Sequence, residues 1–213
     1  MPLLKTINVS PTTQILIWKV TESFDELLAK VVLKEKTQLR LNGMKSELHQ
    51  RAFLSVRMLI QELGINDFDL HYDEFGKPYL SDHRYISITH SHNFASIIVS
   101  EQTVGIDMEL QREKILRIAD KFVNENEWKR LQSFNALDRI KKLTVKWGAK
   151  EAIFKIRNEK GISFKDHIQV HTFEIEDQKA TAILAFENIK QPFSIYFEEI
   201  EDFTLVYAFE KNS

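Results

Sequence analysis

The sequence predicts an α+β protein in which antiparallel sheets pack against helices. Three observations support this fold class. Short apolar segments with strand patterning occur in a run, segments with helical spacing follow them, and a second run of strands closes the chain. Strands and helices that are segregated in this way are typical of α+β proteins, whereas a wound parallel sheet alternates them.

The first half begins with a short apolar strand, QILIWKV, over residues 14–20. Two helices are expected over 24–33 and 44–63, because their apolar residues recur at spacings of three and four. The remaining strands of this half are expected within 68–80, which contains a turn, and at 85–91, 94–100 and 103–110.

The second half begins with two short helical patterns between residues 115 and 134, followed by a longer helix over about 138–157. Its strands are expected at 168–175, 181–187, 193–199 and 203–210. Because the order of strands, helices and strands occurs twice, we expect two similar halves, 1–112 and 113–213, in a pseudo-two-fold arrangement. No low-complexity linker separates them, so we expect the halves to pack as one unit.

Composition narrows the functional classes. The chain has 213 residues and a net charge of −2, which argues against a general nucleic-acid binder because such domains are strongly basic. The absence of cysteine excludes disulfides, thiol nucleophiles and Cys-ligated zinc. The first residues lack the apolar core of a signal peptide, and no apolar run reaches the length of a membrane helix. We therefore expect a cytoplasmic protein that does not bind membranes.

Two carboxylates lie in the apolar segment VGIDMEL, at Asp107 and Glu109. In a strand, residues i and i+2 face the same side, so both side chains can meet on one cation while Ile106 and Met108 face the core. Mg²⁺ prefers such oxygen ligands, together with water and substrate phosphates. The alternative interpretation of this motif, taken alone, is a solvated strand face.

The segment KWGAKEAIFK carries a second group of charges. Glu151 and Lys155 are spaced i, i+4 and share a helix face, from which Lys150 is displaced. A plain stabilising Glu–Lys pair is the alternative. Residues 139–160 hold eight basic and two acidic residues, a local charge of +6 that is suited to phosphates or an acidic partner.

Two shorter motifs suggest anion contacts. FGKPYL is a turn in which Gly76 and Pro78 flank Lys77, and an ordinary hairpin turn is the alternative interpretation. SITHSHN places His90 and His92 on one face if the strand continues. A protonated histidine at a strand end is a good phosphate ligand. A His/Asp zinc site and a half-buried polar histidine are the alternatives.

Taken together and in this order, FGKPYL, ISITHSHN, VGIDMEL, KFVNENEW and WGAKEAIFK resemble the motifs of the 4′-phosphopantetheinyl transferases of the longer, Sfp-like class. The resemblance covers residues 40–170, and the pairing of GIDxE with WxxKEAxxK is highly specific. Ser87 and Thr89 depart from the family's usual Asn and Ser, but both keep a hydroxyl group. The resemblance implies the fold of that family, two fused copies of a small α+β subunit with the active site in the cleft between them.

The resemblance also implies a reaction, in which coenzyme A donates its 4′-phosphopantetheine arm to a serine of an apo acyl or peptidyl carrier protein, with Mg²⁺ bound and 3′,5′-ADP released. Its metal ligands would be Asp107, Glu109 and Glu151. Glu151 would be the general base, Asp107 a further catalytic residue, and Lys155 would stabilise the leaving phosphate. The remaining coenzyme A contacts implied are Arg40, Gly76, Lys77, Pro78, Ser87, Thr89, His90 and Lys150.

Two other functions stay open on the sequence. One is a module that binds coenzyme A or a carrier protein without transferring the arm, because binding and turnover need the same residues. The other is a metal-dependent hydrolase of pyrophosphates that resemble coenzyme A. The basic segment would suit docking of an acidic, helical carrier protein. A chain with two halves can complete its own cleft, so we expect a monomer.

Overall fold

The computed structural model describes residues 3–211 and divides into two compact units, Met1–Gln102 and Thr103–Ser213. The boundary therefore lies between Gln102 and Thr103 rather than between residues 112 and 113. The reason is strand β7 (Val104–Leu110), which pairs antiparallel with the last strand, β11 (Phe203–Glu210). The carboxylate-bearing segment VGIDMEL thus belongs to the second unit, with the helix that carries Glu151.

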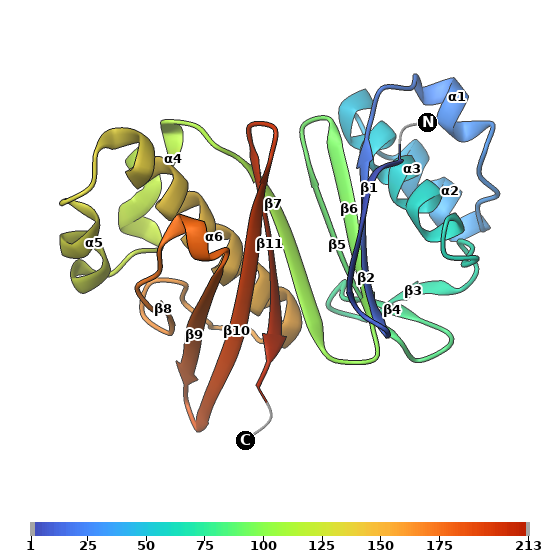
Figure 1. The fold of residues 1–213 in the computed structure, drawn as a ribbon. Helices are drawn as coiled ribbons and strands as arrows, with labels where there is room; N and C mark the ends of the chain where they lie inside the picture. The colour runs from blue at the N-terminus through green and yellow to red at the C-terminus, as the bar shows by residue number, and fades with distance from the viewer. Residues whose placement is uncertain (1–2, 212–213) are drawn as a thin grey trace. The chain divides into compact units, whose positions relative to one another are not determined.

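The first unit is a four-stranded antiparallel sheet with three helices on one face (Figure 1). Leu54, Leu59 and Ile60 of the third helix pack with Leu16 and Ile97 of the sheet in one apolar core. The sheet order is β1 (Leu3–Ser10), β2 (Thr13–Lys19), β6 (Phe94–Ser100), β5 (Tyr85–Ser91), and the helices are α1 (Phe24–Leu28), α2 (Glu35–Asn42) and α3 (Glu47–Gln61). A separate hairpin joins β3 (Leu70–Tyr72) to β4 (Pro78–Leu80).

The second unit is a five-stranded antiparallel sheet against which one long helix, α6 (Ala136–Arg157), is packed. The sheet order is β7, β11, β10 (Ile189–Ile200), β9 (Lys179–Phe186), β8 (Ile168–Val170). Three short helices connect β7 to α6: α4 (Lys114–Ile118), η1 (Ala119–Lys121) and α5 (Glu125–Leu131). A further short helix, η2 (Ile175–Asp177), precedes β9. In Figure 1, α6 follows the sheet beside β7 and β11.

The α+β fold class is confirmed, and three elements were missed: β1, α2 and η2. The strand expected at 168–175 ends at Val170, and η2 begins at Ile175. Strand β1 escaped prediction because it lies at the sheet edge, where most of its side chains are exposed and its pattern is only weakly apolar. The helix expected over 24–33 ends at Leu28, and α2 follows as a separate helix. No helix within residues 3–211 is long and apolar enough to cross a membrane.

Candidate active site

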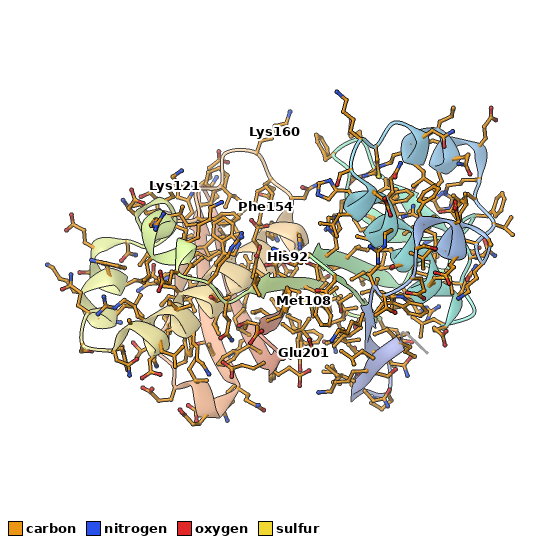
Figure 2. The ribbon with its side chains drawn as sticks, turned by 90° about the horizontal axis from the view of Figure 1, so that it is seen from above. His92, Met108, Lys121, Phe154, Lys160 and Glu201 are labelled. Carbon is orange, nitrogen blue, oxygen red and sulfur yellow. The ribbon has the colours of Figure 1, made fainter. Side chains whose placement is uncertain are left out.

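Glycines allow α6 to lie directly on β7 and β11. A Cβ atom added to Gly105 of β7 would lie 2.0 Å from the backbone oxygen of Ala152, so no side chain fits there. A Cβ added to Gly148 of α6 would lie 2.7 Å from Val206 of β11. This backbone contact between strand and helix brings the face of β7 that carries Asp107 and Glu109 against α6. Figure 2 labels Met108 on β7 and Phe154 on α6.

Both carboxylates of β7 are bound by side chains of α6. The Nζ atom of Lys155 lies 2.8 Å from Oδ1 of Asp107 and 2.8 Å from the backbone oxygen of Ile106. Trp147 donates its indole N–H to Glu109 at 3.2 Å. Ile106 and Met108 are also fully buried, but they alternate with these carboxylates and so lie on the face of β7 away from α6, whereas the sequence predicted that they, and not the carboxylates, face the core.

The charges of Asp107, Glu109 and Glu151 act on one another. Burial, and then the negative charge of Asp107, raise the pKa of Glu151 to about 7, and Glu109 adds to this effect. Burial and the charge of Asp107 also raise the pKa of Glu109, while the indole of Trp147 opposes the rise. Glu109 and Glu151 are therefore each within electrostatic range of Asp107, and the convergence of all three carboxylates on one cation stays a prediction.

The chemistry of this cluster fits a hard divalent cation. Its donors are carboxylate oxygens, and two of its three members have raised pKa values that an added positive charge would lower. Within residues 3–211 no three His, Cys, Asp or Glu side chains are arranged as a preformed metal centre. The ammonium group of Lys155 supplies the positive charge beside Asp107.

The structure corrects the assignment of Lys150 to phosphate binding. Its side chain is fully buried, and Nζ donates to the backbone oxygens of Phe122 (2.5 Å) and Phe164 (2.9 Å) and to Oε2 of Glu127 (3.0 Å). An ammonium group has three donors, and all three are used. Burial lowers the pKa of Lys150 to about 8, against the opposing effect of Glu127. Lys150 is therefore a structural cation.

The basic segment 139–160 is only partly available for docking, because three of its eight basic side chains are buried within the second unit. Three lysines spaced four residues apart, Lys142, Lys146 and Lys150, are buried and bonded to backbone oxygens and carboxylates. Arg139 donates to the carbonyls at the end of α5, and Lys141 pairs with Glu199. Lys142, Lys146 and Lys150 lie on the apolar side of α6, so their long side chains are buried. Backbone carbonyl groups and carboxylates accept their hydrogen bonds there.

In the first unit, Arg40 lines a basic pocket of about 290 Å³, but Gly76, Lys77 and Pro78 of the GKP turn are not among its lining residues. The guanidinium of Arg40 lies 5.1 Å from the ring of Tyr72, and Tyr72 pairs with Pro78 across the β3–β4 hairpin. Gly76 takes a φ of 85°, and Lys77 donates its backbone N–H to Asp73 at 2.8 Å. The pocket is lined by Lys34, Lys36, Thr37, Arg40, Arg57, His71, Tyr72 and Tyr79.

The predicted anion contacts of β5 do not share one face. Ser87 and Thr89 are buried and alternate with His90, which is exposed, so the hydroxyl groups and the imidazole point to opposite sides of the sheet. His90 instead lies beside His49 of α3, with ring centroids 6.1 Å apart. His92 follows the strand in the turn before β6, with a φ of 52°, so the pairing of the two histidines along one strand is wrong (Figure 2).

Sequence reasoning missed the partners that hold the site residues in place. The sequence indicated only that Trp147 is an apolar residue of the helix, although its indole N–H donates a hydrogen bond to Glu109. Glu127 belongs to the matched segment KFVNENEW, but its bonds to Lys146 and Lys150 were not foreseen. The lysines at every fourth position of α6 could have predicted a buried acidic partner, because charged side chains on the apolar side of a helix need one.

This chain is similar to known proteins of one superfamily. Residues 103–208 match the family model of the 4′-phosphopantetheinyl transferase superfamily. The chain is 28% identical over 197 residues to the 4′-phosphopantetheinyl transferase gsp of Aneurinibacillus migulanus, covering 88% of this chain and 81% of that protein. It is 26% identical over 149 residues to the 4′-phosphopantetheinyl transferase ffp of Bacillus subtilis, covering 67% of this chain and 66% of that protein.

A solved structure is also similar in part. It is a holo-(acyl-carrier-protein) synthase from Bacillus anthracis in complex with CoA (3′,5′-ADP), matched with a TM-score of 0.42 at 20% identity over 52% of this chain and 96% of that chain. The fold and carboxylate cluster define an α+β protein with an acidic site on a strand–helix pair. From the family model and the two relatives, the chain belongs to the 4′-phosphopantetheinyl transferase superfamily, in its Sfp-like class.

Proposed function

We propose that this protein transfers the 4′-phosphopantetheine group of coenzyme A to a serine hydroxyl of an apo acyl or peptidyl carrier protein and releases 3′,5′-ADP. The observation that carries the proposal is the cluster of Asp107, Glu109 and Glu151 beside Lys155. In the metal-free protein the pKa of Glu151 is raised to about 7 beside the ion pair of Lys155 and Asp107, and a cation bound at the cluster would lower it. Glu151 would then be ionised at neutral pH and able to accept a proton.

Glu151 is the base in this mechanism. It takes the proton of the carrier serine, directly or through one water, while the serine oxygen attacks the β-phosphorus of the coenzyme A pyrophosphate. The bond from that phosphorus to the bridging oxygen breaks, and 3′,5′-ADP leaves with the electron pair. Lys155, whose ammonium is held by Asp107 and the backbone oxygen of Ile106, stabilises the charge that develops on the leaving phosphate.

Asp107, Glu109 and Glu151 would hold Mg²⁺, which when bound polarises the pyrophosphate and offsets its charge. The donor chemistry of the cluster supports this assignment. Asp107 then has two roles, because it orients Lys155 through one oxygen and contributes to the cation site.

We assign coenzyme A binding to the first unit. The basic pocket next to Arg40 offers cations for a phosphate and the rings of Tyr72 and Tyr79 for a flat base. The turn of Gly76, Lys77 and Pro78 lies next to this pocket in the chain. Pro78 pairs with Tyr72 and is followed by Tyr79, and both tyrosines line the pocket. Further contacts proposed from the family motif are Ser87, Thr89 and His90.

The proposed partner is an acidic, helical carrier protein, and we propose that the enzyme acts as a monomer in the cytoplasm. Transfer to carriers from fatty-acid, polyketide and peptide synthases would identify the partner. Sedimentation would measure the oligomeric state, and cell fractionation would measure the location.

The direct test is the mass gained by an apo carrier protein when it is incubated with coenzyme A and Mg²⁺. Glu151→Gln and, separately, Asp107→Ala are expected to abolish nearly all transfer at saturating Mg²⁺, whereas Glu187→Gln, an exposed carboxylate in the β9–β10 turn, keeps the wild-type rate. Wild-type rates in both site variants would refute the assigned roles. Calorimetry that shows coenzyme A binding without any transfer would instead favour a binding module.

A further inference from the structure

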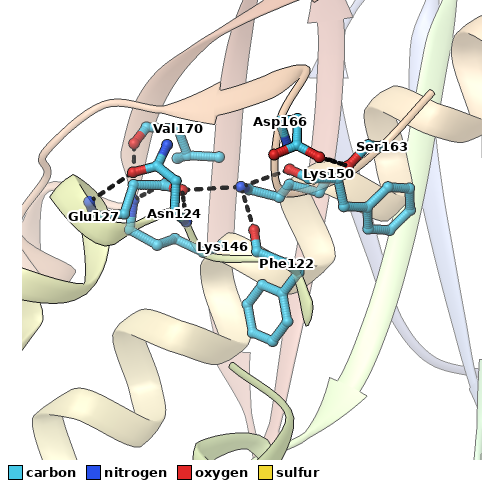
Figure 3. Close-up of polar contacts among 9 residues, drawn as sticks. Phe122, Asn124, Glu127, Lys146, Lys150, Ser163, Asp166 and Val170 are labelled. Carbon is cyan, nitrogen blue, oxygen red and sulfur yellow. Dashed lines mark hydrogen bonds and ion pairs between the residues drawn. The ribbon is translucent and has the colours of Figure 1, made fainter. Parts of the chain in front are cut away.

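A network of polar and aromatic contacts connects the buried Lys150 to Glu109. Figure 3 shows the ammonium group of Lys150 among the residues that it contacts. Two of its three hydrogen bonds go to the backbone oxygens of Phe122 and Phe164, which belong to two different connecting segments of the second unit. The third goes to Glu127, which is itself buried.

The rings of the same two phenylalanines enclose Trp147. The ring centroid of Phe122 lies 5.1 Å from that of Trp147 in an edge-on arrangement, and the centroid of Phe164 lies 5.5 Å away. Aromatic pairs at these separations are favourable and orient each other. One buried cation therefore anchors the backbone of both residues whose rings set the plane of the indole.

The indole in turn holds a carboxylate of the candidate active site. Trp147 Nε1 donates to Oε1 of Glu109 at 3.2 Å, and an indole N–H can donate in only one direction, in the plane of the ring. A tilt of the ring would therefore displace or break this bond. Groups that orient the ligands of a metal site affect its affinity strongly, although they do not touch the metal.

We propose that Lys150 is a positioning residue that sets the orientation of Glu109 through Phe122, Phe164 and Trp147. This inference rests on the proposed role of Glu109 as a ligand of the divalent cation. It gives Lys150 a function that differs from phosphate binding, and it accounts for a buried ammonium whose three donors go to Phe122, Phe164 and Glu127.

The neighbouring Lys146 provides a matched control. It is also buried on α6, and it also binds Glu127, through Oε1 at 2.8 Å, but its other bond goes to the backbone oxygen of Val170 and not to either phenylalanine (Figure 3). Lys146→Met and Lys150→Met each leave Glu127 paired with one lysine. They remove equal charge, and only Lys150→Met releases the residues that flank Trp147.

The first measurement is the fluorescence of Trp147 in a Trp18→Phe/Trp128→Phe background, which leaves a single tryptophan. Lys150→Met is expected to shift the emission maximum and to lower the anisotropy of Trp147, and Lys146→Met is expected to leave both unchanged. Phe164→Leu, which keeps every backbone bond and removes one flanking ring, should change the emission in the same direction. This variant carries the test if Lys150→Met does not fold.

The second measurement is the Mg²⁺ affinity of each variant by calorimetry, which needs no turnover. Lys150→Met and Trp147→Phe should each weaken Mg²⁺ binding by about 10–100-fold, and the double variant should be no weaker than either alone, because both act through one bond. Lys146→Met should bind Mg²⁺ as the wild type does.

The outcomes separate this proposal from the proposed function. If Lys150→Met matches Lys146→Met in both fluorescence and Mg²⁺ affinity, or if the effects of Lys150→Met and Trp147→Phe add, the positioning role is refuted. If the wild type binds Mg²⁺ but transfers nothing to any carrier, the proposed function fails while the positioning role still stands on the binding data.

Discussion

Lys155 of α6 and Asp107 of β7 form an ion pair of 2.8 Å between the two elements that build the candidate active site. The same ammonium group donates to the backbone oxygen of Ile106, so two bonds define its position. Asp107 is almost fully buried, whereas the side chain of Lys155 is 28% exposed. Lys155 is therefore anchored to the strand and still partly accessible, which is compatible with its proposed contact with a substrate phosphate.

Replacing Lys155 by methionine should lower the single-turnover transfer rate by about 10²-fold or more, a loss typical of removing one group that stabilises developing charge. The rate should be measured at saturating coenzyme A and carrier. Lys155→Arg keeps the charge with a different geometry and should recover part of the rate. A methionine variant with the wild-type rate would exclude Lys155 from the chemistry.

Gly105→Ala should destabilise the second unit by several kcal/mol, beyond the about 1–3 kcal/mol that is typical of overpacking, because its Cβ would collide with backbone and not with a flexible side chain. Urea unfolding measures this change. Gly43→Ala is the control, since its Cβ would meet neighbouring atoms only at 3.5 Å or more and its φ of −77° suits alanine. Equal stability of the two variants would mean that β7 and α6 do not pack as described.

The stability of the metal-free protein should fall as the pH rises from about 4.5 to 7. The pKa of Glu151 is raised from its ordinary 4.5 to about 7, so the folded state binds more protons than the unfolded state in this window. Stability therefore falls with rising pH, and the loss is complete above the folded pKa. Glu109, whose pKa is also raised, acts in the same direction.

Glu151→Gln removes this contribution. In EDTA, its melting temperature should match the wild type near pH 4.5 and exceed it increasingly towards pH 7.5. Glu187→Gln, in an exposed turn, should show no such trend. A difference between Glu151→Gln and wild type that stays constant across the pH range would contradict the raised pKa.

Arg40→Ala should raise the KM for coenzyme A by about tenfold and leave kcat nearly unchanged, because a lost phosphate contact weakens ground-state and transition-state binding equally. Steady-state kinetics with varied coenzyme A provide the measurement. Arg84→Ala is the control, since Arg84 pairs with Asp82 in a turn of the same unit away from the pocket. Equal KM values for the two variants would remove Arg40 from the binding site.

Local patterns were enough to predict the fold class and most strands of both units. Alternation and short apolar runs identified β5, β6 and β7 because these strands carry large buried side chains. The same reasoning missed β1, whose exposed edge position leaves little pattern. It also placed the boundary of the units too late, because the pairing of β7 with β11 joins residues almost a hundred positions apart, and no local pattern reports that contact.

The sequence by itself determined the chemistry of the site: a D-x-E strand, a KEAxxK helix, and the faces on which their carboxylates and Lys155 lie. Only the tertiary structure decided what each charge does. Lys150 and Lys155 are identical in type and five positions apart, yet one is buried among carbonyl groups and the other pairs with Asp107. The physical reason is that the role of a long charged side chain depends on which polar partners the packed elements place within its reach, and those partners come from distant parts of the chain.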